Sequence, residues 1–461
     1  MWKTRIPYRL IDFSSRIHPA DDFVIGIKRI SDTGGAGSWT WIDRNDNSVD
    51  VEDGYFSRHP TYQFEEVNIG GNEMIAIPKF YVKSDTTGRI WISPTPREDE
   101  GFHVHPAFMS KDQEMSETYT DANGVVHDET KIMIGKWPSW IDYYHILGEK
   151  RRLWSIPSFT EDQIDAIEQE KIAKAKAENP NVDEDSVKFS EAERIALRTI
   201  YPSVEATYWE NWYAADSWND HSDDGLVLVN GFHMMNVWEW SAIQLLALIE
   251  SKSPDAQLHY GEGNSIGTRL DAVDGDRNMS SNFHGIIGLW GNVWQWIQGV
   301  QTYYNGHIYV WDNIGNEVWK DTKKAIPMRQ KENEVWSQGE TCGYWRDRIF
   351  ASGYNYDTLD MFLPDGNSFT SDYYKGSWSD GVWGRTLSQS KDLYACAVGG
   401  PYNSGSWCGL FGWNFNVRLG NKTVKNGFIE EEIRYAYPDV AARLCFSPVN
   451  LAPQGEDNSN S

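Results

Sequence analysis

The sequence predicts an α+β fold made mainly of short strands with few helices, and three observations support this. The chain of 461 residues contains 39 Gly, 23 Trp and 23 Tyr, a composition typical of short strands joined by tight loops. Residues 288–296 place aromatic and amide side chains at every second position, which is the period of a strand. Only a few segments show helical periodicity. The positions at period two are Trp290, Asn292, Trp294 and Trp296.

We interpret residues 288–296 as a core strand around which the rest of the chain is organised. Three indoles on one strand face bury a large area and have few rotamers. Gly291 interrupts the pattern, and a glycine inside a strand indicates a bulge or the close approach of another backbone.

The composition excludes several classes of function. The formal net charge is 42 − 67 = −25, which argues against binding to nucleic-acid backbone or to anionic lipid. No run of 18 apolar residues is present, so we expect no membrane insertion. The first nine residues lack the apolar core of a signal peptide, so we expect synthesis in the cytoplasm. A chain of this length has room for two to four domains.

The first part of the chain, residues 1–70, predicts a small N-terminal β module. Residues 23–30 have strand composition, and residues 32–37 form a Gly-rich loop without the Lys-Ser/Thr of a phosphate-binding loop. Attachment to a larger assembly is a role that we consider for this module.

Helices are predicted in two places. Within residues 158–200, we expect two charged helices that each begin with a capping box. The first begins with the pattern from Thr160 to Gln163 and should end before Asn179. The second begins with the pattern from Ser190 to Glu193 and should end near Tyr201. Residues 236–249 give the clearest helix, with Asn236 as cap and Glu239 at the box position. Its apolar stripe should pack on a sheet that includes residues 288–296. The stripe consists of Trp238, Ala242, Leu245, Leu246 and Ile249.

Candidate metal ligands are sparse. His103 and His105 are two residues apart, but no third ligand has a telling spacing, so we favour a packed histidine pair. An acidic segment could offer oxygens to calcium, although its spacing is not that of an EF-hand and we favour a hydrated loop. The residues of that segment are Asp271, Asp274, Asp276 and Asn278. We therefore expect neither a metal nor another cofactor.

The four cysteines lack a metal-binding spacing. Cys342, Cys396, Cys408 and Cys445 contain no C-x-x-C pair, and free buried thiols are the simplest interpretation. A Cys396–Cys408 bridge is an alternative that spacing does not decide.

The C-terminal part of the chain predicts a turn-rich β region. Asn305-Gly306 and Asp365-Gly366 are hairpin signals within residues 299–395. Residues 398–418 form a Gly- and aromatic-rich block, residues 421–427 predict a hairpin, and residues 454–461 predict a flexible tail.

Together these segments resemble the C-type-lectin-like fold of formylglycine-generating enzymes and of the variable proteins of phage diversity-generating retroelements. The resemblance is carried by the helix at 236–249, the strand at 291–296, Gly399-Gly400 with residues 403–407, and the closing residues 442–446. It implies one lectin-like domain over residues 71–453, with the charged helical insertion inside it. Residues 421–439 are an insertion relative to that pattern.

The resemblance implies a phage tail or fibre protein of the virion that binds a host surface ligand, either glycan or protein. The ligand-binding face would lie in the C-terminal block, where aromatic side chains offer contact area and Asn and Ser adapt their hydrogen bonds. It also implies other virion tail proteins as partners and a homotrimer by analogy. The expected binding residues are Tyr402, Asn403, Ser406, Trp407, Phe411, Trp413 and Phe415.

Two other functions remain open at this point. One is a structural virion adaptor or decoration protein without a receptor role, which would dock through the N-terminal module and the charged helices. The other is an oxidase of the formylglycine-generating kind, for which Cys396 and Cys408 would be the copper ligands. Because the sequence contains no Ser-His-Asp elbow, paired carboxylates at a telling spacing or dinucleotide fingerprint, we expect no catalytic residues and no enzyme activity.

Overall fold

The computed structural model contains mixed α+β architecture with mostly antiparallel sheets, in agreement with the predicted fold class. It describes residues 22–447 apart from 32–37, 111–112, 115–118, 121–125, 128–130, 145, 147–150, 220–230, 271–279, 304–306, 312–317, 326–339, 346–359, 364–368, 371–379, 386–393, 406–407, 426–427 and 434. The tail predicted at 454–461 lies outside these residues.

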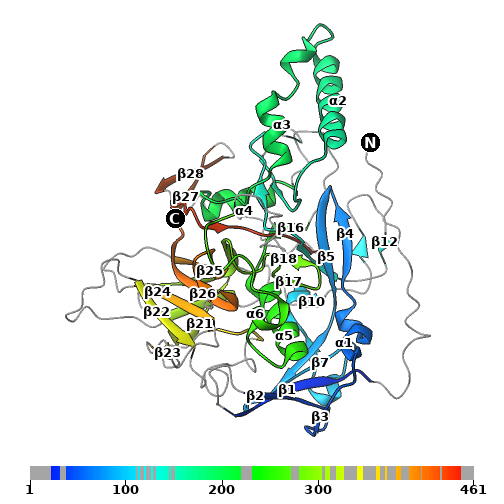
Figure 1. The fold of residues 1–461 in the computed structure, drawn as a ribbon, viewed down its shortest axis with the longest axis vertical. Coiled ribbons are helices and arrows are strands. Elements are labelled where there is room, and N and C mark those ends of the chain that lie inside the picture. Colours follow the sequence, from blue (N-terminus) through cyan, green and yellow to red (C-terminus); the bar gives the residue numbers. More distant parts are fainter. Residues whose placement is uncertain are drawn as a thin grey trace, which may run out of the picture.

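Three larger sheets form the frame of the molecule (Figure 1). The first sheet has six strands in the order β3-β2-β1-β7-β6-β8. The second has five strands in the order β16-β30-β13-β5-β4. The third has nine strands, of which eight follow the order β21-β20-β19-β25-β26-β24-β22-β23 and the ninth, β29, pairs parallel to β19. The strands of the first sheet are β1 (Ile25–Ser31), β2 (Ser38–Ile42), β3 (Ser48–Val49), β6 (Tyr81–Ser84), β7 (Ile90–Ser93) and β8 (His103–Val104). Those of the second are β4 (Glu65–Ile69), β5 (Asn72–Pro78), β13 (Lys131–Gly135), β16 (Phe232–Met234) and β30 (Leu444–Phe446). Those of the third are β19 (Trp294–Thr302), β20 (His307–Trp311), β21 (Trp319–Ala325), β22 (Glu340–Trp345), β23 (Phe369–Thr370), β24 (Gly381–Arg385), β25 (Tyr394–Gly399), β26 (Gly409–Arg418) and β29 (Val440–Ala441).

The smaller elements connect these sheets. The strand pairs are β9 (Met109–Ser110) with β10 (Gln113–Glu114), β11 (Tyr119–Thr120) with β12 (Val126–His127), β14 (Trp140–Ile141) with β15 (Leu153–Trp154), β17 (Asn282–Phe283) with β18 (Ile286–Ile287), and β27 (Asn421–Lys425) with β28 (Phe428–Ile433). The last pair is the predicted hairpin. The α-helices are α1 (Tyr55–Arg58), α2 (Glu161–Glu178), α3 (Glu191–Arg198), α4 (Tyr208–Asp216), α5 (Val237–Ser251) and α6 (Ala256–Tyr260). Short 3₁₀ turns cover Pro60–Tyr62, Glu98–Glu100, Pro106–Phe108 and Glu184–Ser186.

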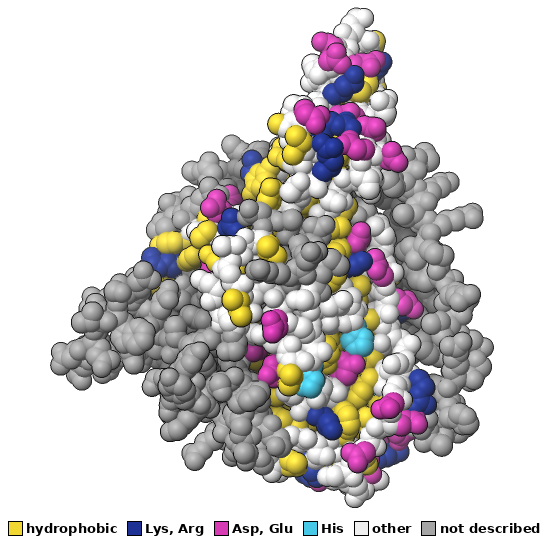
Figure 2. All heavy atoms as spheres, viewed as in Figure 1, with side chains coloured by type: hydrophobic (Ala, Val, Ile, Leu, Met, Phe, Trp, Pro, Cys, Tyr) yellow, Lys and Arg dark blue, Asp and Glu magenta, His cyan; other side chains and the backbone are white. Residues whose placement is uncertain are grey.

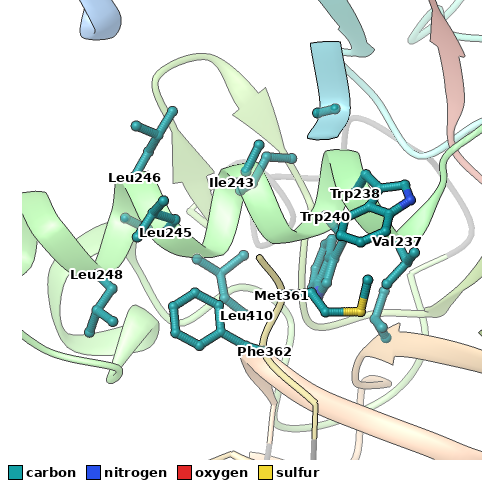
Figure 3. Close-up of a cluster of buried hydrophobic side chains, with 14 of the residues drawn as sticks. Val237, Trp238, Trp240, Ile243, Leu245, Leu246, Leu248, Met361, Phe362 and Leu410 are labelled. Carbon is teal, nitrogen blue, oxygen red and sulfur yellow. The ribbon is translucent and has the colours of Figure 1, made fainter. Parts of the chain in front are cut away.

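Helix α5 forms where the sequence predicted it, with the predicted cap, and it lies in the core. Asn236 caps it by accepting from the amides of Trp238 and Glu239, and the Glu239 side chain accepts from the Asn236 amide. The prediction of a single apolar stripe was too narrow, because every residue from 237 to 249 is buried. Figure 3 shows apolar side chains of α5 clustered with Met361, Phe362 and Leu410 from other segments. The polar Gln244 on α5 is buried as well.

The strand predicted at 288–296 forms only from Trp294 onward. Gly288, Gly291 and Asn292 have left-handed backbones, with φ of 67°, 77° and 60°, which no continuous strand accommodates. Trp290 therefore packs in the cluster around α5, while Trp294 and Trp296 pack in a second cluster on the other side of the sheet. The three indoles are all buried, but they do not share one strand face.

The boundary expected after residue 70 does not coincide with a break in the structure. Residues 69 and 72 are paired in the β4–β5 hairpin, and β1 pairs with β7, so strands from both sides of the boundary share sheets. Ile25, Ile27 and Trp39 also belong to the core cluster that surrounds α5. The N-terminal strands therefore pack as part of the main body.

The charged insertion projects from the body as a helical arm formed by α2 and α3 (Figure 1). Both predicted capping boxes are present, with Thr160 and Gln163 on α2 and Ser190 and Glu193 on α3. Helix α2 ends at Glu178, before Asn179 as predicted, whereas α3 ends at Arg198, about one turn earlier than expected. Arg194 links the two helices through ion pairs with Glu161, Asp165 and Glu168.

Candidate functional site

The structure describes five of the seven predicted binding residues, and three of them are buried. Phe411, Trp413 and Phe415 on β26 are exposed to only 2%, 1% and 0%, so the expectation that they face outward is wrong. Alternation along β26 turns all three toward the core, where Phe411 packs against Phe362 with ring centroids 5.4 Å apart. Ser406 and Trp407 lie outside the described residues.

Tyr402 and Asn403 do lie at the surface, in the turn between β25 and β26. Tyr402 is half-buried and Asn403 is exposed. The side chain of Gln257 on α6 fixes this turn. Its Nε2 donates to the carbonyls of Gly405 and Cys408 at 2.8 and 2.6 Å. The Gly405 amide donates to the Ser265 carbonyl at 2.8 Å. These bonds join the turn to the loop that follows α6.

The Gly399-Gly400 pair allows β25 to enter this turn. Both residues have a left-handed backbone, with φ of 94° and 99°. A Cβ on Gly399 would lie 2.3 Å from the carbonyl oxygen of Leu289, a contact that no side chain tolerates. The glycines therefore bring residues 401–405 close against residues 289–292.

Asn292 is the hydrogen-bonding centre of this region, although the sequence led us to place it on a strand face. Its Oδ1 accepts from the Leu270 amide at 2.6 Å and from Asn264 Nδ2 at 3.0 Å, and its Nδ2 donates to the Leu270 carbonyl at 2.9 Å. Its carbonyl accepts from the Tyr402 amide at 3.2 Å. Asn adopts a left-handed backbone more readily than most residues do. The Gly-Asn pair inside the tryptophan pattern was therefore a sequence signal for a turn at this position.

Replacing Asn292 with alanine should loosen both surface loops. The change strains a left-handed backbone and leaves Leu270 groups unpaired, at about 1–3 kcal/mol for each buried polar group. We expect amide hydrogen exchange at residues 264–270 and 401–405 to accelerate at least about tenfold, which corresponds to ~1.4 kcal/mol. The matched control is Asn403→Ala, at an exposed position of the same turn, and equal exchange in both variants would contradict the role of Asn292.

We define the loop platform as residues 257–268 together with 401–405. It displays Ile266 and Leu258, which at 71% and 68% are the most exposed large hydrophobic side chains in the described part of the chain. Tyr402 and Asn403 belong to the same platform, because hydrogen bonds from Gln257 and to Ser265 hold their turn against residues 257–268. In the view of Figure 2, backbone and uncharged polar side chains make up much of the middle of the molecule, where Figure 1 places α6, with acidic, histidine and hydrophobic side chains among them. The exposed side chains of the platform include His259 and Glu262, and its other contacts with a partner would be uncharged.

A histidine–glutamate pair lies next to the platform at the end of α5. His284 Nε2 is 2.8 Å from Glu250 Oε2, and the Tyr260 hydroxyl donates to the same oxygen at 3.0 Å. A carboxylate at a helix C-terminus is disfavoured by the helix dipole, so these two donors compensate it. Burial and then the Glu250 charge hold the pKa of Tyr260 well above its usual value, so it remains a neutral donor. We interpret this group as support for the platform.

The predicted metal candidates do not come together. His105 is buried and accepts from the Ala107 amide, whereas His103 is half-exposed and bonds Asp360 Oδ2 at 2.5 Å, so the two histidines have separate partners. Among the residues that the structure describes, no group of three or more His, Cys, Asp and Glu side chains is placed to hold a metal ion. The acidic segment with Asp271 lies outside the described residues.

The described cysteines are buried free thiols. Cys396, Cys408 and Cys445 form no bridge, so the alternative of a Cys396–Cys408 disulfide is not realised. Burial, and then the charge of Asp380, raises the pKa of Cys408 to about 12.

No protein-family model and no curated protein matches this chain. Within the described ranges, no helix has both the length and the apolar character needed to cross a bilayer. Functional assignment therefore depends on the loop platform and on the chemistry of its residues.

Proposed function

We propose that this protein is a phage virion component of the tail or fibre type, which binds a host surface ligand through the loop platform. The observation that carries the proposal is the exposure of Ile266 and Leu258 beside Tyr402 and Asn403 on loops held by a dense hydrogen-bond network. Exposed apolar side chains on a rigid support are typical of interaction sites, because little conformational entropy is lost on binding.

The finer part of the proposal is that the body has the C-type-lectin-like fold. Three features support it: the capped central helix α5, the strand β19 that follows the left-handed residues Gly291-Asn292, and the closing strand β30. The same analogy suggests other tail proteins as partners and a homotrimer as the assembly.

Binding to intact cells tests the platform. In the triple variant Leu258→Ser, Ile266→Ser, Tyr402→Ala, we expect binding of the labelled protein to a panel of bacterial strains to weaken at least about tenfold, since each buried aliphatic side chain contributes about 1.5–3 kcal/mol. Substitutions at exposed positions should change folding stability by no more than about 0.5 kcal/mol each.

The matched control is the double variant Ile30→Ser, Ile195→Ser, which removes two exposed isoleucines outside the platform. It should bind as the parent protein does. Equal loss of binding in both variants would remove the platform from the proposal. A parent protein that binds no strain in a broad panel would contradict receptor recognition itself.

A second candidate function is a structural adaptor within the virion. The observation that favours it is the α2–α3 arm, which projects from the body and exposes Ile195 to 53% (Figure 1). An electron cryomicroscopy map of the assembled particle separates the two functions. An exposed loop platform at the tail tip supports receptor binding, whereas a platform buried between subunits supports the adaptor.

A further inference from the structure

The hairpins formed by β19, β20 and β21 carry aromatic side chains on the face turned away from the core. On the inner face, Val300, Ile308 and Val310 are buried in the cluster around α5. The register pairs Gln301 with Tyr309, Tyr309 with Asp321 and Trp311 with Trp319, and paired residues point to the same side of a sheet. We call Tyr303, Tyr309, Trp311 and Trp319 the outer aromatic row.

The rings of this row form two contacting pairs. Tyr303 and Tyr309 have centroids 4.4 Å apart, and Trp311 and Trp319 have centroids 6.1 Å apart. Trp311 is buried because it covers Gly299, where a Cβ would lie 2.9 Å from its ring. Tyr303, Tyr309 and Trp319 are only half-buried, so part of each ring faces outward.

Polar side chains with fixed orientations lie beside these rings. His307 Nδ1 is 3.1 Å from Asp321 Oδ2, and Lys323 Nζ donates to the same oxygen at 2.7 Å. Gln301 Nε2 donates to the Tyr303 hydroxyl at 2.8 Å. The Asp321 carboxylate held in place by such bonds retains further lone pairs for a ligand, whereas Gln301 is buried and serves to orient the Tyr303 hydroxyl.

From this arrangement we infer that the outer aromatic row is a second binding surface, and that its ligand is a neutral oligosaccharide. Sugar rings present flat C–H faces that stack on aromatic rings, and their hydroxyl groups need fixed donors and acceptors at the edge. The partly exposed rings of Tyr303, Tyr309 and Trp319 are available for such stacking, whereas the buried Trp311 packs against Trp319 and supports its ring.

Charge selects a neutral ligand over an anionic one. The Asp321 carboxylate is paired on this face with the Lys323 ammonium, so this ion pair carries no net charge. The chain as a whole carries a net charge of −25, which disfavours the approach of a polyanion. This surface is separate from the loop platform, and neither proposal depends on the other.

The inference is tested by titrating the full-length protein with three neutral tetrasaccharides: cellotetraose, maltotetraose and chitotetraose. Sialyllactose serves as the anionic comparison. We expect at least one neutral tetrasaccharide to perturb tryptophan fluorescence and to show heat in calorimetry. Trp319→Ala and Tyr309→Ala should each weaken that binding about tenfold or more, because truncated aromatic anchors dominate contact energies. Trp319→Phe should restore much of it, and Leu258→Ser with Ile266→Ser should leave it unchanged.

A row that only stabilises the hairpins by cross-strand packing gives a different result. In that case no tetrasaccharide binds the parent protein, while Trp319→Ala lowers its stability, and the inference is overturned. Stronger binding of sialyllactose than of every neutral tetrasaccharide overturns the assignment of ligand class. Loss of binding in the platform variant places the sugar on the loop platform instead.

Discussion

Replacing Arg443 with methionine is expected to prevent the protein from accumulating in its folded form. Arg443 is completely buried between β29 and β30, and its guanidinium donates to four acceptors. The donated bonds reach Gln295 Oε1 at 2.7 Å and the carbonyls of Gly135, Ile287 and Gly288 at 2.6, 2.8 and 2.9 Å. This one side chain thereby connects the segment between β29 and β30 with β13, with the β18–β19 connection and with β19.

The expected effect is large because methionine fills the volume but leaves the acceptors without donors. Each buried unsatisfied group costs about 1–3 kcal/mol, so the total approaches the ~5–15 kcal/mol by which domains are stable. Burial lowers the pKa of Arg443 to about 9, so the guanidinium is still charged at neutral pH. Arg443→Lys should also be strongly destabilising, since an ammonium cannot reach the same set of acceptors.

Soluble yield and urea unfolding followed by tryptophan fluorescence measure this effect. The matched control is Arg198→Met on α3, which breaks two exposed ion pairs, with Glu161 and Glu191. Exposed pairs of this kind contribute about 0–1 kcal/mol. An Arg443→Met protein whose stability lies within about 1 kcal/mol of the parent would show that the network does not hold these segments together.

Replacing Glu239 with glutamine should cost about 3–5 kcal/mol, because it removes one partner of a buried ion pair. Glu239 Oε1 is 2.7 Å from His233 Nε2, and its Oε2 accepts from the Asn236 amide at 2.9 Å. His233 Nδ1 is 2.9 Å from the Gly231 carbonyl, so both ring nitrogens face acceptors. An imidazolium satisfies both, whereas a neutral ring satisfies only one.

This pair also predicts a dependence of stability on pH. Burial alone would lower the pKa of His233, but the charge and hydrogen bond of Glu239 outweigh burial and raise it above its ordinary value of 6.5. Because the folded-state pKa is raised, the stabilisation is complete below pH 6.5 and is lost as the pH rises through the folded-state value. Glu239→Gln should remove this loss on the alkaline side.

Urea midpoints measured at several pH values between 6 and 9 test both expectations. Glu250→Gln is the matched control, since Glu250 pairs with His284 at 2.8 Å but both side chains are partly exposed. Its cost should be near 1 kcal/mol or less. Equal destabilisation by the two substitutions, or an unchanged alkaline slope in Glu239→Gln, would show that the buried pair has no special weight.

The sequence identified three of the six α-helices that the structure describes, α2, α3 and α5, because their signals are local. The capping boxes at Thr160, Ser190 and Asn236 require only residues three positions apart, and all three are present in the structure. The same signal occurs at Thr207 and Glu210, which cap α4, a helix that was not predicted. Helix α4 could therefore have been predicted from its capping box, because this signal does not depend on tertiary contacts.

The direction of strand side chains was harder to predict. Along β26, one face carries Phe411, Trp413 and Phe415 and the other carries Asn414 and Asn416, so alternation itself favours burial of the aromatic face. The expectation that these aromatic side chains face outward came from the resemblance. The strand expected at 288–296 failed in its first half because period two in the sequence is also compatible with left-handed residues in a loop. There, Asn292 bonds residues that are about 22 positions away in the sequence.

The sequence by itself therefore determined the α+β class, the capped central helix and the charged arm, since each follows from composition or from contacts within one turn. Only the tertiary structure decided which aromatic residues are buried, which loops form the exposed platform, and that Arg443 joins distant segments. Those features depend on strand register and on hydrogen bonds between residues as far apart as 135 and 443, whose meeting is set by the packing of the whole chain.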